Sequence, residues 1–250
     1  MAGHSKWAQI KRKKGATDAK RGQLFSKLTR AIIVASREGG PDPAGNLALQ
    51  NAIEKAREAS MPKDNIERAI ARGAGAAGDG TAYETVTYEG YGPAGVAVYV
   101  EAVTDNRNRT AADVRSIFTK SDGSLGESGS VAWLFERRAV VLVGGDADED
   151  ELTMAAAEGG ADDVVREGEV WRVTSAPEAL AAVREAIEGA GFVVESAELT
   201  MVPRTTIELG EESAARKVLR LMDALEENDD VQDVYANFDI PERVLEVVAG

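Results

Sequence analysis

The sequence predicts a multidomain α+β protein, with an N-terminal three-helix domain followed by two α+β domains, the last of which is inserted into the middle one. Three observations lead to this prediction. The chain has 250 residues, more than a single domain usually contains. Helical periodicity dominates residues 1–80, whereas strand and helix patterns alternate afterwards. The net charge divides at the same place, with +7 on residues 1–80 and −21 on residues 81–250, within a total of −14.

The composition excludes several classes of protein. Hydrophobic residues make up 44% and charged residues 29%, which is typical of a folded, soluble chain. Cysteine is absent, so disulfides and thiolate chemistry are excluded, as suits the cytosol. No apolar run approaches the roughly 20 residues of a membrane helix, and the basic N-terminus lacks the apolar stretch of a secretory signal. We therefore expect a cytoplasmic protein without a membrane partner.

Residues 1–16 are predicted to be a flexible basic arm. The first 30 residues contain nine Lys or Arg and a single acid, Asp18. Residues 1–16 are too basic and too poor in apolar side chains to fold alone, so we expect them to order on binding a polyanion. Trp7 either stacks on an unpaired base or packs against the helical domain. Phosphate contacts are expected from Lys6, Lys11, Arg12, Lys13 and Lys14.

Residues 17–80 are predicted to form the helical domain. The first helix begins after Thr17 and ends in Glu38–Pro41; the second is capped by Asn46; the third opens at Pro62 and ends at Gly73. One side of the first helix is apolar, with Leu24, Phe25, Leu28, Ala31, Ile32 and Ala35, and the opposite side carries Lys20, Lys27, Arg30 and Arg37. We expect nucleic-acid contacts from Lys20, Arg21, Lys27 and Arg30.

Residues 81–136 and 204–250 are predicted to form one α+β domain, interrupted by residues 137–203. The first part contains strand patterns at 83–92, 93–104 and 130–135 and a helix pattern at 105–123. Residues 137–203 follow the order β-α-β-β-α-β, with a hairpin turning at Glu167–Gly168, which is a ferredoxin-like unit. The flanks do not close a sheet separately. Residues 204–250 add a short strand, a helix at 211–227 and a final strand.

One polar motif stands out in the acidic part of the chain. TDNRNRT places Arg107 and Arg109 where a strand meets a helix N-terminus. Backbone N–H groups and two guanidiniums suit a phosphate group. Capping of the helix and pairing with nearby acids is the alternative interpretation.

No motif supports a reaction. GAGAAG at Gly73–Gly78 follows a helix and precedes a strand, so it is a linker rather than a dinucleotide fingerprint. DADEDE at Asp146–Glu151 lacks the glycine of a calcium loop. The single histidine, His4, lies in the arm, which excludes a folded histidine triad and a multi-histidine metal site. We predict no enzyme, no metal and no cofactor; an enzyme that uses carboxylates is the third hypothesis.

Several long motifs resemble the YebC/PmpR family. They are MAGHSKWAQIKRKKGATDAKRGQLFSKLTR, MPKDNIERAIARGAG, YEGYGPAGVAVYVEAVTDNRNRT, SDGSLGESGSVAWLFERR and ALEENDDVQDVYANFDIPE. The resemblance runs nearly end to end; one departure is Leu47, where the family often has Pro. It implies one helical and two α+β domains, the third inserted into the second. It also implies a cytoplasmic, DNA-binding transcriptional regulator, while mitochondrial relatives are translational activators and bacterial relatives have been linked to ribosomes.

The first functional hypothesis is therefore a DNA-binding transcriptional regulator that holds phosphates with its arm and first helix. The alternative is a translation factor that binds ribosomal RNA. No helix-turn-helix motif with base-reading Asn, Gln and Arg at groove spacing is evident, and basic arms mainly contact phosphates. The sequence thus predicts a nucleic-acid partner without choosing between DNA and RNA.

Overall fold

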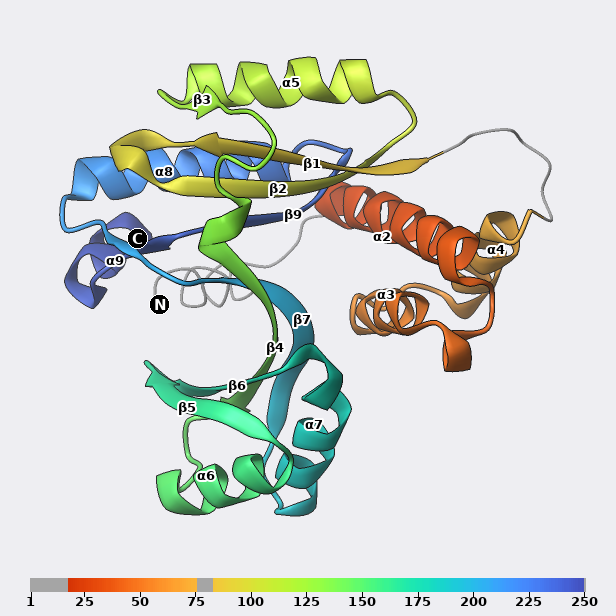
Figure 1. Ribbon diagram of the computed structural model, residues 1–250, viewed down its shortest axis with the longest axis vertical. Helices are drawn as coiled ribbons and strands as arrows, with labels where there is room; N and C mark the ends of the chain where they lie inside the picture. Colours follow the sequence, from red (N-terminus) through yellow and green to blue (C-terminus); the bar gives the residue numbers. More distant parts are fainter. Residues whose placement is uncertain (1–17, 76–82, 250) are drawn as a thin grey trace. The chain divides into compact units, whose positions relative to one another are not determined.

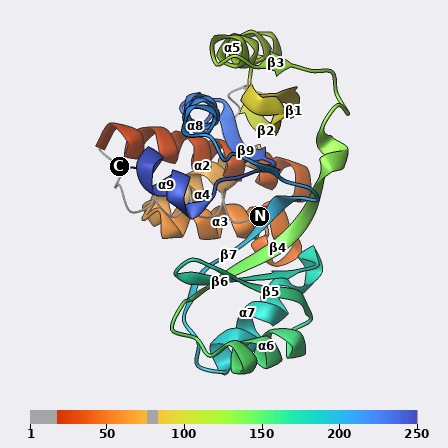
Figure 2. The ribbon, with the colours of Figure 1, turned by 90° about the vertical axis from the view of Figure 1, so that its left-hand side faces the viewer.

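The computed structural model describes residues 18–75 and 83–249 (Figure 1). These residues form two compact units. One comprises 133–208 and 237–241, and the other comprises 18–75, 83–132, 209–236 and 242–249. N-terminal helices are followed by two four-stranded sheets with helices, so the expected mixed α+β class is confirmed. A second view shows the same elements turned by 90° (Figure 2).

Three helices form the N-terminal part: α2 (Asp18–Gly39), α3 (Leu47–Glu58) and α4 (Lys63–Gly73). Both α3 and α4 pack against α2. Leu24 does not join this core as expected and is 41% exposed, because the packed length of α2 begins at Phe25. The expected cap Thr17 lies outside the described residues. The buried core consists of Leu28, Ile32, Ile33, Ala35, Leu49, Ala52, Ile53, Ala56, Met61, Ile66 and Ala69.

Two residues expected at helix ends hold this bundle together. Asn46 is buried and caps α3 by accepting from the N–H of Leu49 at 3.1 Å. Its amide also donates to the carbonyls of Ala35 and Gly40, at 2.8 Å each, which ties α3 to the end of α2. Gly73 ends α4 as predicted; a Cβ there would lie 2.7 Å from that of Ser36, so only glycine allows this approach.

The first sheet has the order β3-β1-β2-β9. Its strands are β3 (Ser124–Leu125), β1 (Glu84–Tyr91), β2 (Ala97–Thr104) and β9 (Val231–Ala236), and all neighbours are antiparallel. The helices α5 (Arg107–Lys120) and α8 (Glu212–Glu226) pack against each other and against this sheet. In the sequence, β1 and β2 precede residues 133–208 and β9 follows them, yet the three strands are neighbours in one sheet.

The expected strand at 130–135 is wrong. Residues 132–134 form a 3₁₀ turn, and the next strand begins at Phe135. The physical reason is the carboxylate of Glu89, which accepts from the N–H groups of Gly129, Val131 and Ala132 at 2.6–2.7 Å. Those N–H groups are therefore not available to a strand partner.

The second sheet has the order β5-β6-β4-β7, with antiparallel neighbours throughout. Its elements in chain order are β4 (Phe135–Gly144), α6 (Glu149–Glu158), β5 (Ala161–Glu167), β6 (Val170–Ser175), α7 (Leu180–Gly189) and β7 (Val194–Pro203). The hairpin turns at Gly168 and Glu169, one residue later than expected. A core that includes Val141, Leu152, Trp171, Val173 and Ile187 joins α6 and α7 to this sheet.

Three short elements complete the chain. The strands β8 (Ile207–Glu208) and β10 (Phe238–Asp239) pair in parallel. The helix α9 (Glu242–Ala249) was not predicted, because the eight residues follow a strand pattern directly and contain two adjacent valines. Arg216 on α8 donates to the carbonyl of Val247, which links α9 to α8.

Candidate nucleic-acid interface

The predicted contact residues of the arm lie outside the described residues. They are Lys6, Trp7, Lys11, Arg12, Lys13 and Lys14. Lys20 and Arg21 belong to the first turn of α2, but their side chains are not among those described. The remaining four predicted residues, Lys27, Arg30, Arg107 and Arg109, fall at two places in the same compact unit.

Lys27 and Arg30 of α2 contact the end of α8 and the segment between α8 and β9. Lys27 Nζ donates to the backbone oxygen of Glu226 at 2.5 Å. Arg30 Nη1 donates to the backbone oxygen of Asp229 at 2.6 Å and to Asp230 Oδ1 at 3.0 Å. These carbonyls lie at and after the C-terminal end of α8, where the helix dipole favours cations. Either cation would have to exchange a protein oxygen for a phosphate oxygen on binding nucleic acid.

Asp230 joins three segments of the chain. Its Oδ2 accepts from Arg109 Nη2 at 2.8 Å, from Thr110 Oγ1 at 2.7 Å and from Thr104 Oγ1 at 3.2 Å, while Oδ1 receives Arg30. The residue is only 5% exposed. A buried carboxylate with this many donors is well compensated, so Asp230 connects α2, the start of α5 and β9.

The two arginines of TDNRNRT have different roles. Asn106 caps α5 and accepts from the N–H of Arg109 at 3.1 Å. The Arg109 guanidinium is held by Asp230 and by Asp105 at 2.9 Å, which is the pairing with acids that the sequence left open. Arg107 is exposed, and within residues 18–75 and 83–249 no carboxylate pairs with its guanidinium. Of the two arginines, Arg107 is therefore the one whose charge has no carboxylate partner in the described part of the chain.

Two carboxylates have lowered pKa values. Burial alone would raise the pKa of Asp230, but the hydrogen bonds from Arg109 and Thr110 and the nearby guanidiniums hold it below its ordinary value. Burial would also raise the pKa of Glu89, and three backbone N–H donors outweigh that effect and lower it. The hydrogen bonds that Arg109 donates to Asp230 and Asp105 raise the pKa of its guanidinium further above neutral pH. All three groups are charged at physiological pH.

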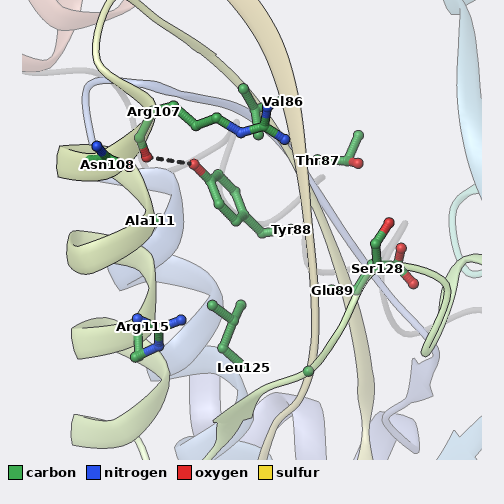
Figure 3. Close-up of a pocket in the computed structure, with 11 residues that line it drawn as sticks. Val86, Thr87, Tyr88, Glu89, Arg107, Asn108, Ala111, Arg115, Leu125 and Ser128 are labelled. Carbon is green, nitrogen blue, oxygen red and sulfur yellow. Dashed lines mark hydrogen bonds between the residues drawn. The ribbon is translucent and has the colours of Figure 1, made fainter.

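A pocket of about 280 Å³ lies between β1, α5 and the loop that follows β3. Figure 3 shows Arg107 extending from the first turn of α5 toward Val86, with Tyr88 beneath it. The Tyr88 hydroxyl donates to the carbonyl of Arg107 at 3.3 Å. Arg115 lies two turns further along α5, beside Leu125 (Figure 3).

Sequence reasoning missed three of these residues. Asp230 stands in the run EENDD, which has the appearance of a solvated acidic cluster. Glu89 gave one weak signal, because it lies inside a strand pattern, and an acid there needs donors if it is buried. Arg115 could have been found from Arg107, since positions i and i+8 share one face of a helix.

The described residues contain neither a membrane-spanning helix nor a cluster of metal ligands. None of the helices in this part of the chain is long and apolar enough to cross a membrane. No group of three His, Asp or Glu side chains in it is placed to hold a metal ion.

Comparison with known proteins assigns both parts of the chain. Residues 5–76 match the model of the TACO1/YebC N-terminal domain, and residues 83–238 match that of the TACO1/YebC second and third domain. A protein from Rubrobacter xylanophilus named "Probable transcriptional regulatory protein" is 61% identical, with 100% of each chain covered. A protein from Geobacter sp. with the same descriptive name is 55% identical, with 98% of this chain and 99% of the relative covered.

A solved structure of a conserved hypothetical protein from Aquifex aeolicus is also similar. It is 52% identical and has a TM-score of 0.79, and the match covers 90% of this chain and 93% of that one. These features define a class of proteins in which a helical domain with a basic N-terminal segment is joined to α+β domains. The chain belongs to the YebC family.

Proposed function

We propose that the protein is a non-enzymatic, cytoplasmic regulator that binds nucleic acid, with duplex DNA as the first candidate target. The observation that carries the proposal is the concentration of nine Lys or Arg in the first 30 residues of a chain with a net charge of −14. Such a segment neutralises phosphates and releases counterions. The names of its relatives, which describe transcriptional regulatory proteins, point the same way.

A second candidate target is ribosomal RNA, and the surface of α4 favours it. Four residues separate α3 from α4, the spacing found in helix-turn-helix motifs. However, the exposed residues at the start of α4 include Asp64 and Glu67 beside Lys63 and Arg68, and Lys63 Nζ lies 3.5 Å from Glu67 Oε1. Carboxylates on a recognition helix would be repelled by the phosphates that line the major groove. Sequence reading by α4 is therefore disfavoured, which weakens the case for site-specific duplex binding.

The domain boundaries are part of the proposal. We infer that residues 137–203 are a ferredoxin-like domain inserted between 81–136 and 204–250. The antiparallel strand order β5-β6-β4-β7 supports this, as does the pairing of β2 with β9 across the insertion. Limited proteolysis of the full chain should release a resistant fragment close to 133–208, and cleavage inside it at the same rate as elsewhere would contradict the inference.

The experiment that tests the function is a competition between the two candidate targets. The full chain is incubated with a fragmented genomic duplex library and with ribosomal RNA fragments at about 0.15 M salt, where screening is physiological. We expect weak discrimination among duplex sequences, with structured or partly unpaired RNA bound at least as well. If instead one duplex motif were enriched by a thousandfold or more, and RNA competitor did not reduce that enrichment, the protein would be a site-specific DNA-binding regulator. Retention of neither nucleic acid would refute the proposed function.

A further inference from the structure

The pocket beside α5 is lined on one side by two arginines and on the other by a loop that the fold holds in place. Arg107 and Arg115 are both exposed and line it. Within the described part of the chain neither guanidinium has a carboxylate partner, whereas Arg109 between them has two. Since acids outnumber bases by 43 to 29 in this chain, two unpaired guanidiniums on one helix face are unusual and favour an anionic ligand.

The opposite wall is an exposed glycine-containing loop that is held in a defined position. The Glu89 side chain is 4% exposed and accepts from three N–H groups of residues 129–132, while its backbone oxygen accepts from Gly126 at 2.7 Å. The hydroxyl of Tyr91 donates to the carbonyl of Ser130 at 3.1 Å. An exposed loop anchored by a buried carboxylate keeps its shape without a ligand, so the pocket is preformed.

The spacing of the two arginines limits the ligand. Residues 107 and 115 lie on one face of α5, separated by about 12 Å along the helix axis at a rise of about 1.5 Å per residue. Figure 3 shows their side chains at opposite ends of the pocket, with the small Ala111 between them. One phosphate cannot occupy both ends, so the ligand carries at least two anionic groups in a row. A volume of about 280 Å³ admits a single chain of such groups and not a double helix.

We propose that this pocket binds the sugar–phosphate backbone of an unpaired nucleic-acid strand, with phosphates on Arg107 and Arg115. Asn108 and Ser128, which also line the pocket, supply polar groups for the sugar. This inference rests on the proposed function and deepens it, because it gives the folded part of the chain a binding site of its own. The site does not require the basic arm.

The test uses the full chain and a hexaribonucleotide probe that carries one photoreactive base. The variant Arg107→Ala/Arg115→Ala is compared with the control Arg184→Ala/Arg216→Ala, which removes the same charge from α7 and α8. We expect the first pair to weaken binding of the probe by about tenfold or more and to lower the log–log salt slope by about 1.4, or 0.7 for each phosphate contact on a single strand. The control should change neither quantity appreciably.

Two further results complete the test. Arg107→Lys/Arg115→Lys should restore most of the binding, because a lysine still supplies a point charge to a phosphate. Crosslinks of the bound probe should map to peptides that contain Tyr88 or residues 107–115. If the wild-type protein binds the probe and the double alanine variant binds it equally well, the pocket proposal is wrong and the proposed function stands. If the wild-type protein binds longer DNA and RNA but no hexamer, the pocket proposal also fails. Failure with every nucleic acid would refute both.

Discussion

Replacing Asp230 with Asn should destabilise the unit that contains α2, α5 and β9. The substitution keeps the volume of the side chain and removes its charge. Four donors then lose the carboxylate of Asp230: the guanidiniums of Arg30 and Arg109 and the hydroxyls of Thr104 and Thr110. Arg109 keeps its ion pair with Asp105. The loss of stability therefore measures the junction at Asp230, the set of hydrogen bonds by which its carboxylate links α2, β2 and α5.

The size of the effect follows from the burial of each partner. Breaking a fully buried ion pair costs about 3–5 kcal/mol, whereas an exposed pair contributes about 0–1 kcal/mol. The Asp230 side chain is 7% exposed, but those of Arg109 and Arg30 are 48% and 21% exposed, so water and other oxygens partly replace the missing carboxylate. We therefore expect a decrease of about 3 kcal/mol in the free energy of unfolding, at the lower end of the buried range.

Urea denaturation followed by far-UV circular dichroism measures this decrease. Asp229→Asn is a matched control, because that side chain is exposed and, among the described residues, accepts from Gln23 Nε2 alone, at 2.9 Å. The control should stay within about 0.5 kcal/mol of the wild-type protein. If the Asp230 variant also stays within that margin, the reasoning about the junction is refuted.

The pH dependence gives an independent check. The folded-state pKa of Asp230 lies below its unfolded value of about 3.9, so its charge adds stability above that value. The added stability disappears as the pH falls through the folded-state pKa. The wild-type protein should therefore lose more stability than Asp230→Asn between about pH 5 and pH 2. Parallel acid profiles would contradict this assignment.

Three other substitutions have outcomes set by named contacts. Asn46→Ala removes one helix cap and two buried amide donors and should cost about 2–3 kcal/mol of unfolding free energy, measured by urea denaturation. Glu89→Gln should speed hydrogen exchange at residues 129–132, and it should weaken the acid sensitivity of stability because the pKa of Glu89 is lowered in the folded state. Arg172→Met should cost about 3–5 kcal/mol, because it leaves Glu167 buried without its partner at 2.7 Å, and adding Glu167→Leu should recover much of that stability.

The regular elements could be predicted from the sequence because their determinants are local. The helical bundle follows from apolar spacing and from the cap at Asn46, and the strands of the second sheet follow from short valine-rich segments between turns. The strand expected at 130–135 failed because its N–H groups bond to Glu89, about 40 residues earlier in the chain. No local pattern reports such a long-range contact.

The candidate site was predictable only in part for the same reason. The motif TDNRNRT identified Arg107 and Arg109, but the separation of their roles depends on Asp230, more than 100 residues away. Likewise, the sequence predicts that Lys27 and Arg30 lie on the polar side of α2, whereas their contacts with the end of α8 and the segment after it depend on the tertiary fold. Sequence periodicity assigns a residue to one face of a helix, but the tertiary fold determines which residues that face contacts.

The salt dependence of nucleic-acid binding tests the central claim most directly. The variant in which Lys11, Arg12, Lys13 and Lys14 are all alanine is compared with the wild-type chain, and Kd is measured from about 0.05 to 0.3 M salt. A matched control replaces four basic residues outside the N-terminal segment, Arg184, Arg204, Arg216 and Lys217. If the basic arm holds phosphates, the log–log slope of the arm variant should fall by about 0.7–0.9 for each phosphate that the arm no longer neutralises, with weaker binding and unchanged folding. An arm variant whose slope and affinity equal those of the wild-type chain would contradict the account.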